Sequence, residues 1–370
     1  MSENDVSYDD VPCDLMRLLF TKQRPEDLVI AMCVCKSWRA IIRDSSFVYA
    51  HLKHCRRTSL TDHNASLIVD GAHNYDAFQF SMQYSEEFTG HRHCRILFDN
   101  LYYTVETSSD GLVLLSATGC RQKMLLWNPA IRKFKLVPVS GIRNLPHCRT
   151  GFRPVHEQQV LVVGFGCIEC NNKYDYKIVQ VLYYFSDNAF QHSYVTVYSL
   201  WSNSWRRIRA TPPCYTNVDV SNAFVNEAVH WRAESSADCW VIMAFDLREE
   251  VFREIPLPDH HHDYYSMYWY IAVFEELLSV VLHYQNQEGY DFVEIWVMKE
   301  YRVVDSWSKL FVLGPTRFLY PLGYMKSRRV LLESRFEKLV IYYPNHGQRQ
   351  DVMHPVGLTT YLESLALLDD

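Results

Sequence analysis

The chain has 370 residues, of which 48% are hydrophobic and 14% aromatic, and its formal net charge is −6. This composition supports a large buried core and argues against a mainly disordered chain, and the scattered lysines and arginines argue against nucleic-acid binding. With no secretory signal pattern, no apolar stretch long enough to cross a membrane and eleven irregularly spaced cysteines, we expect a non-membrane protein of the cytosol or nucleus.

The first fifty residues predict a short helical unit. A leucine-rich helix is expected to begin at Pro12, and a second helix at Pro25 has an apolar face that runs on to Ile42. Ser45 or Ser46 is expected to cap a last helix. The other apolar positions with helical spacing are Leu15, Leu18, Leu19, Leu28, Ala31, Met32, Cys35, Trp38 and Ile41.

A helical unit of about 45 residues buries too little apolar surface to be stable alone. It therefore requires a second surface to pack against. That surface is either the rest of the chain or a separate adaptor protein.

Three sequence pieces in this unit, VPCDL, CVCKSWRAII and SSFVYAHL, occur in order between residues 11 and 52 and together resemble an F-box domain. The resemblance implies an F-box over residues 9–55 that binds a Skp-type adaptor, and through it a cullin and a RING subunit. Gln23 and Arg24 stand where many plant F-boxes have a leucine–proline pair. The adaptor contacts carried over from the family are Pro12, Leu15, Val34, Cys35, Lys36 and Trp38.

From about residue 90 onward the sequence predicts β structure, because short runs of Val, Tyr, Phe and Trp are broken by Asn, Asp, Gly and Pro. Each repeat centres on one aromatic residue, and the five are Trp127, Tyr198, Phe245, Trp296 and Tyr342. The last three intervals are 47, 51 and 46 residues. Such a period is typical of β-propeller blades, with an open β-sandwich as the alternative. The first interval, 71 residues, requires a loop or additional strands between 140 and 190.

The β part also resembles a known family. AVHWRA, FDLREEVFREIPLP, EIWVMKEYRVVDSW and YLESLALL are similar to the plant F-box associated domain, and the agreement with S-locus F-box proteins covers most of residues 105–368. The resemblance implies a β-propeller-like substrate-binding domain over residues 56–370. It also implies a substrate receptor of a Skp-cullin-F-box ubiquitin ligase, and in the S-locus proteins the target is an S-locus ribonuclease of the self-incompatibility system in pollen. We expect YLESLALL to supply the strand that closes the ring.

No sequence pattern predicts catalysis. The motifs of serine hydrolases, zinc proteases, P-loops and dinucleotide sites are absent, so a propeller enzyme is the less favoured alternative. Cys167 and Cys170 form a single C-x-x-C without the second pair of a zinc site, and a run of three histidines from His260 cannot face one ion. We expect no metal or other cofactor.

Two segments are predicted to bind the target protein, because polar and aromatic residues interrupt the repeat there. They span residues 140–175 and 259–270. Tyrosine, tryptophan and arginine supply much of the binding energy at protein interfaces. The substrate-binding candidates are therefore Arg149, Tyr264, Tyr265 and Trp269.

Overall fold

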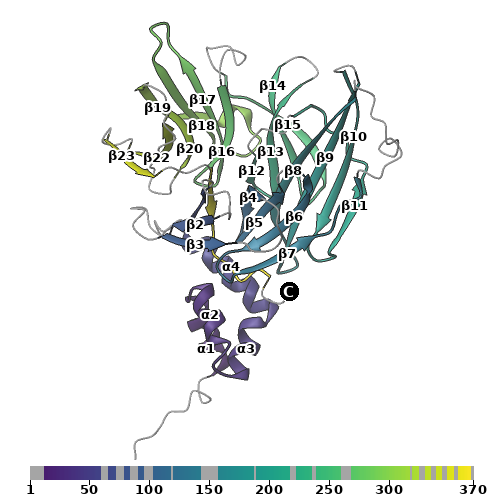
Figure 1. Cartoon of the computed structure of the whole chain (residues 1–370), viewed down its shortest axis with the longest axis vertical. Helices are drawn as coiled ribbons and strands as arrows, with labels where there is room; N and C mark the ends of the chain where they lie inside the picture. The colour runs from purple at the N-terminus through teal and green to yellow at the C-terminus, as the bar shows by residue number, and fades with distance from the viewer. Residues whose placement is uncertain are drawn as a thin grey trace, which may run out of the picture.

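The computed structural model shows a helical module, residues 12–59, below a β domain that contains the rest of the described chain (Figure 1). The described residues are 12–59, 66–71, 79–83, 91–95, 103–117, 120–142, 157–186, 189–216, 222–235, 239–259, 268–316, 319–324, 330–334, 339–343, 348–353 and 357–367. The fold is thus mainly β with helices at the N-terminus, as the sequence predicted.

The helical module contains α1 (Cys13–Thr21), α2 (Pro25–Ala31), α3 (Lys36–Arg43) and α4 (Ser45–Ser59). Pro25 occupies the first turn of α2, where the missing N–H leaves no hydrogen bond unmade. The domain boundary expected at residue 55 falls inside α4.

Two local details of the module differ from the sequence prediction. The apolar pattern from Pro25 to Ile42 does not form one helix, because Cys35 is extended and its Sγ accepts a hydrogen bond from the backbone N–H of Trp38, which starts α3. Asp44, rather than Ser45 or Ser46, caps α4. Its Oδ1 accepts hydrogen bonds from the backbone N–H groups of Ser46 and Phe47, at 2.9 and 3.2 Å.

The core of the module is built from one residue or two per helix. The buried side chains are Met16 and Phe20 of α1, Leu28 of α2, Ile42 of α3 and Phe47 of α4. The Trp38 ring packs edge-to-face on Phe20, with 5.2 Å between ring centroids. The leucines of α1 that carried the sequence pattern lie outside this core.

The described part of the β domain forms six four-stranded antiparallel sheets. Sheet 1 contains β24 (Gly357–Tyr361), β1 (Ser66–Gly71), β2 (Gln79–Gln83) and β3 (His91–Arg95), and sheet 2 contains β4 (Tyr103–Ser109), β5 (Leu112–Ala117), β6 (Cys120–Asn128) and β7 (Lys133–Val137). Sheet 3 contains β8 (Glu157–Cys170), β9 (Lys173–Ser186), β10 (Ala189–Ser199) and β11 (Ser204–Ile208), and sheet 4 contains β12 (Asn222–Val225), β13 (Ala228–Glu234), β14 (Trp240–Asp246) and β15 (Val251–Pro256). Sheet 5 contains β16 (Tyr268–Phe274), β17 (Leu277–Gln285), β18 (Asp291–Met298) and β19 (Trp307–Thr316), which follows a short 3₁₀ turn (Val304–Ser306), and sheet 6 contains β20 (Leu319–Tyr324), β21 (Val330–Ser334), β22 (Leu339–Tyr343) and β23 (Gln348–Met353).

The sheets are arranged as the blades of a closed propeller. The inner strands β24, β4, β8, β12, β16 and β20 each contact the next one, and β20 contacts β24. β24 is the last strand in the chain, yet it pairs with β1, the first, in the register Val69 to Leu358. The C-terminus therefore closes the ring by completing sheet 1, which leaves no inner strand without a neighbour.

The sequence repeat corresponds to one position in the blades. The five aromatic centres lie on β6, β10, β14, β18 and β22, each the third strand of its sheet. The long first interval arises because β8 and β9 have 14 residues each. The segment 140–175 was expected to interrupt the strands of the repeat. This prediction is wrong for residues 157–170, which form β8. The expected closing strand also lies earlier, since β24 ends at Tyr361, the first residue of YLESLALL.

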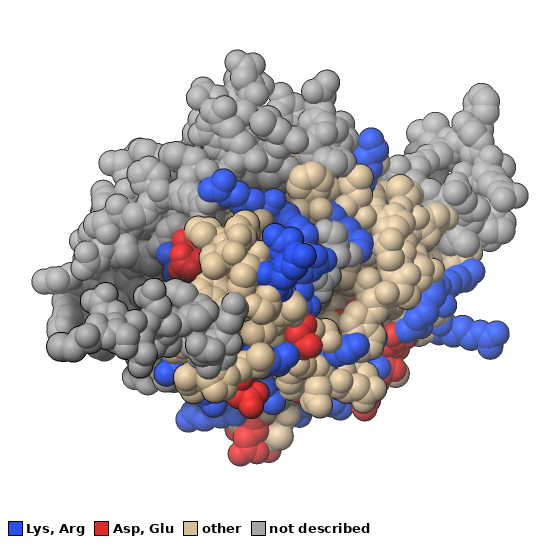
Figure 2. All heavy atoms as spheres, turned by 90° about the horizontal axis from the view of Figure 1, so that it is seen from below, with Lys and Arg blue, Asp and Glu red and all other residues tan. Residues whose placement is uncertain are grey.

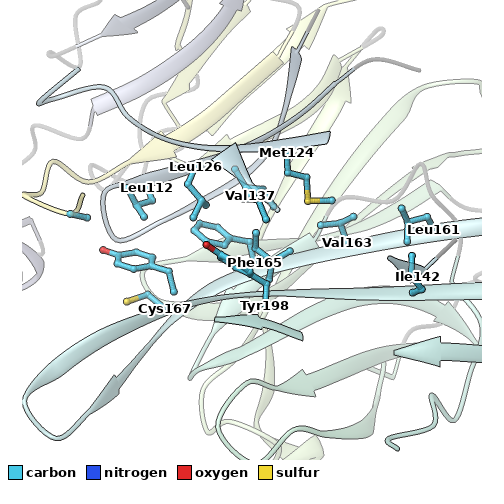
Figure 3. Close-up of a cluster of buried hydrophobic side chains, with 14 of the residues drawn as sticks. Leu112, Met124, Leu126, Val137, Ile142, Leu161, Val163, Phe165, Cys167 and Tyr198 are labelled. Atoms are coloured by element: carbon cyan, nitrogen blue, oxygen red, sulfur yellow. The ribbon is translucent and has the colours of Figure 1, made fainter. Parts of the chain in front are cut away.

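The sheets pack through apolar faces, as the cluster between sheets 2 and 3 shows (Figure 3). Leu126, Phe165 and Tyr198 are buried there. Gly166 allows β8 to approach sheet 4, because a Cβ at this position would lie 2.1 Å from the Phe224 ring. The glycines flanking Phe165 thus serve packing.

Two-residue turns join the first and second strands of sheets 2 to 5. Non-glycine residues in these turns have φ between 47° and 65°, as type I′ hairpin turns require. The turn residues are Asp110 and Gly111, Asn171 and Asn172, Asn226 and Glu227, and Glu275 and Glu276. Because strands alternate in direction, these turns share one side of the ring, which faces the helices and is called the module face. The opposite side, where the inner strands begin, is the far face.

Candidate functional site

The helical module exposes a group of large apolar side chains. These are Leu15, Leu18 and Leu19 of α1, Ile30 of α2 and Val34 of the following turn, and they are between 48% and 68% exposed. This group is called the apolar module surface. Neither the module core nor the β domain covers it, and exposed apolar groups of this kind are typical of protein-interaction sites.

The predicted adaptor contacts occupy different environments. Leu15 and Val34 belong to the apolar module surface, and Pro12 and Lys36 are also exposed. Cys35 and Trp38 are partly buried, because one caps α3 and the other packs on Phe20. Substituting either of these two would therefore change the module's own stability as well. Their contact with an adaptor stays a prediction.

The module is basic although the chain as a whole is acidic. Residues 12–59 contain nine Lys and Arg against four Asp and Glu, a formal charge of +5, whereas the whole chain carries −6. Seen from the module side, lysine and arginine side chains gather near the middle of the molecule (Figure 2). An acidic partner would therefore be steered toward this end.

Helix α4 anchors the module to the module face of the propeller. The Arg56 Nε donates to Asp110 Oδ1 at 2.6 Å, and the Arg56 guanidinium lies 4.5 Å from the centroid of the Tyr174 ring. The Tyr49 hydroxyl donates to Glu169 Oε1 at 2.5 Å. Polar contacts on two different sheets fix the direction of α4.

The segment after β24, residues 361–367, forms a second anchor and is called the C-terminal segment. Leu365 is buried in the core of the helical module. Glu363 accepts from Arg24 of the module at 2.9 Å. On the propeller side, the buried Asn128 side chain donates to the carbonyls of Ser364 and Ala366 at 2.9 and 2.8 Å. The same few residues thus bind to sheet 2 of the propeller and complete the helical core.

Only one of the predicted target contacts lies within the described residues. Arg149, Tyr264 and Tyr265 lie outside them. Trp269 is described, and its side chain is 0% exposed, so the prediction that it contacts a target directly is wrong. Successive strand residues point to opposite sides, and in β16 the exposed neighbour is Tyr268, 57% exposed.

At the far face, Trp269 contributes to a cluster that sequence reasoning missed. Arg232 of β13 lies 4.1 Å from the Trp240 ring centroid and 5.0 Å from that of Trp269. The three residues come from β13, β14 and β16, which belong to two sheets. Arg232 and Trp240 lie on paired strands of sheet 4, and the packing of sheet 5 against sheet 4 adds Trp269.

Buried titratable groups in the β domain have structural partners. His230 contacts the Ala223 carbonyl at 3.2 Å through Nδ1 and the Tyr301 hydroxyl at 2.8 Å through Nε2, and burial lowers its pKa to about 4. Burial raises the pKa of the Cys167 thiol. Among the described residues no three His, Cys, Asp or Glu side chains are placed to hold a metal ion. Within the same residues, no helix is long and apolar enough to span a membrane.

Comparison with known proteins matches both parts of the chain to families. Residues 9–49 match the F-box domain, and residues 58–369 match the F-box associated beta propeller domain. The F-box/kelch-repeat protein At3g23880 of Arabidopsis thaliana is 26% identical over 352 residues, which cover 91% of this chain and 89% of that protein. The F-box protein CPR1 of the same plant is 25% identical over 357 residues, covering 89% and 81% of the two chains.

Similarity to solved structures is weaker. A mutant of AofleA from Arthrobotrys oligospora aligns with a TM-score of 0.40 and 10% identity, over 77% of this chain and 81% of the other. Aleuria aurantia lectin aligns with a TM-score of 0.34 and 9% identity, over 80% and 97% of the two chains. Similarity at this level gives no basis for transferring a binding property.

Proposed function

The chain belongs to the plant F-box proteins that carry an F-box associated β-propeller domain, and from that premise we propose that it is the substrate receptor of a Skp-cullin-F-box ubiquitin ligase. In this role the helical module binds a Skp-type adaptor, and the adaptor brings the cullin and the RING subunit. The propeller holds the target protein while other subunits transfer ubiquitin. The receptor itself is non-catalytic, and it works in the cytosol or the nucleus.

The apolar module surface is the observation that carries this proposal. Five large apolar side chains, between 48% and 68% exposed, lie within the helical module, on two short helices and the turn that follows them. Covering such side chains is favourable by roughly 25 cal/mol for each Å² removed from water. The formal charge of +5 on the module adds attraction for an acidic adaptor.

Binding of a purified plant Skp-type adaptor to the full chain tests the proposal. We expect Leu18→Asp or Val34→Asp to weaken adaptor binding at least 100-fold, because each places a carboxylate in the apolar contact. Val139→Asp is the matched control, since Val139 is 60% exposed but lies on the β domain, and it should bind within twofold of the wild type. Unchanged binding by both module variants would contradict the adaptor role of this surface.

Trp38→Ala is also expected to abolish adaptor binding, because it destabilises the helical module that carries the apolar module surface. Removing a large, partly buried aromatic side chain costs about 3 to 5 kcal/mol when burial is complete, and somewhat less here. The lost contact with Phe20 would loosen α1 against α3. Circular dichroism of the variant separates loss of the helical fold from loss of a contact.

A narrower proposal concerns the target. The similarity of AVHWRA, EIWVMKEYRVVDSW and YLESLALL to S-locus F-box proteins supports an S-locus ribonuclease as the protein to be ubiquitinated. A different plant protein is the alternative, and the names of the two relatives given above do not refer to the S-locus. Ubiquitination assays with a panel of S-locus ribonucleases, and an unrelated ribonuclease as control, distinguish these targets. Failure with every S-locus ribonuclease would remove this target class and leave the receptor role intact.

A further inference from the structure

The far face holds an arginine that packs against two neighbouring tryptophans. Arg232 lies near the end of β13, with its guanidinium 4.1 Å from the Trp240 ring centroid and 5.0 Å from that of Trp269. The two indole rings meet edge-to-face, 6.0 Å apart. Arg232, Trp240 and Trp269 are called the arginine–tryptophan cluster. Cation–π contacts with both rings restrain a side chain that would otherwise be flexible.

Among the described residues, the Arg232 guanidinium has few hydrogen-bond partners. One of its nitrogens, Nη1, donates to the backbone carbonyl of Trp269 at 3.3 Å. Its Nε is buried and has no hydrogen-bond partner among the described residues. Across the same residues, no carboxylate forms an ion pair with it. Burial lowers the pKa of Arg232, and electrostatic interaction with Tyr268 and Glu234 acts in the opposite direction.

Two other partly buried arginines, one on α4 and one on β6, differ in this respect. Arg56 pairs with Asp110 at 2.6 Å, and Arg121 pairs with Glu106 at 3.0 Å. Withdrawing a cation from water without a counter-ion is unfavourable. A guanidinium that packing holds in place near the surface, without an ion-pair partner among the described residues, can bind an anion from outside with little further loss of side-chain freedom.

We propose that Arg232 binds a carboxylate of the target protein, an inference that rests on the receptor role proposed above. A guanidinium presents parallel N–H groups that match the two oxygens of a carboxylate. Phosphate groups carry nearly twice the charge and are usually bound by several arginines, whereas this cluster contains one. The exposed ring of Tyr268, next to Trp269 on β16, offers an apolar surface beside the charge.

The position of the cluster agrees with this role. Arg232, Trp240 and Tyr268 lie at strand ends on the far face, while the adaptor-binding module occupies the opposite side. A bound target therefore does not compete with the adaptor for space. The ligand is an acidic segment, and its carboxylate is either an Asp or Glu side chain or a free C-terminus.

Peptide selection on the full chain in complex with its adaptor tests the inference. Two random decapeptide libraries are used, one with amidated C-termini and one with free C-termini. We expect the wild type to enrich Asp or Glu at one position of the amidated library; enrichment confined to free C-termini instead identifies a C-terminal carboxylate. A selected peptide should lose at least tenfold in affinity when its acid is replaced by the corresponding amide.

Variants connect this preference to the cluster. Arg232→Glu should change the selected residues from acidic ones to Lys and Arg. Arg232→Lys keeps the charge but not the planar guanidinium, and it should lower the affinity for the acidic peptide at least fivefold. Arg209→Glu is the control, because Arg209 is exposed just after β11 at the same side of the ring and outside the cluster. No acidic enrichment by the wild type, or equal selectivity in Arg232→Lys and Arg209→Glu, would overturn the inference. Adaptor binding measured on the same samples reports the receptor role separately.

Discussion

His230 shows how a single buried side chain makes stability depend on pH. It is 0% exposed. Its Nδ1–H donates to the Ala223 carbonyl, and in the neutral ring Nε2 accepts from the Tyr301 hydroxyl, so neither ring nitrogen of the neutral form lacks a partner. Burial lowers the pKa from 6.5 to about 4. The folded state therefore resists protonation that the unfolded chain accepts.

We predict that this difference weakens the fold at acidic pH. Because the folded pKa is the lower one, the contribution is complete above pH 6.5 and is lost as pH falls toward 4. Between pH 7 and 4 the free energy of unfolding should fall by about 3 kcal/mol more in the wild type than in His230→Gln. Urea denaturation of both proteins at the two pH values measures this, and parallel losses in both would contradict it.

Residue environments were only partly predictable from the sequence. The sequence indicated that leucines follow one another at helical spacing in α1, but Met16 and Phe20 take the core and Leu15, Leu18 and Leu19 remain outside. Which face of α1 is buried depends on how the other helices pack against it, and the spacing of apolar residues in the sequence does not show this. Trp269 was misplaced for a similar reason, since a shift of one residue along β16 exchanges its sides.

At the scale of elements, β24 and the C-terminal segment can be separated experimentally. Deleting residues 357–370 removes the inner strand of sheet 1 and should abolish the cooperative unfolding of the propeller, because β1, β4 and β20 lose a neighbour. Deleting residues 362–370 keeps the strand, so the propeller should still unfold cooperatively, although the loss of Leu367 weakens it, and the helical module should loosen. Hydrogen exchange of the two truncated proteins distinguishes these outcomes. Equal protection of the propeller in both would show that β24 is dispensable.

Element prediction succeeded where the sequence repeats and failed where it does not. The third strands of sheets 2 to 6 share an aromatic residue, so their period was visible. Strands β1 to β3 contain few aromatic residues, and the inner strand that completes their sheet comes from residues 357–361. A sheet assembled from the two ends of the chain has no local period, so sheet 1 was missed.

On the scale of the whole molecule, the helical module depends on the propeller for part of its core. Leu365 of the C-terminal segment is 1% exposed and packs with Phe20, Leu28 and Ile42. Replacing a fully buried leucine by alanine costs about 2 to 5 kcal/mol. The module, with its small core, has little stability to lose.

We therefore predict that Leu365→Ala uncouples the two parts. The wild type should unfold in one calorimetric transition, whereas the variant should show a separate, earlier transition for the helical module. Leu367→Ala, at another buried leucine of the same segment that packs on the sheet 2 and 3 core, provides a control in which the propeller is weakened instead. A single, equally shifted transition in both variants would contradict the uncoupling.

The position of β24 has a consequence for biosynthesis. A ribosome delivers β1 to β3 before the strands of the other sheets and β24 after them, so sheet 1 stays incomplete until those sheets have been synthesised. Nascent chains and products of premature termination expose unpaired strand edges, which chaperones and proteases engage. Ring closure therefore follows the synthesis of all the other described strands, and a chain cut short before residue 357 would retain strand edges that β24 covers in the full fold.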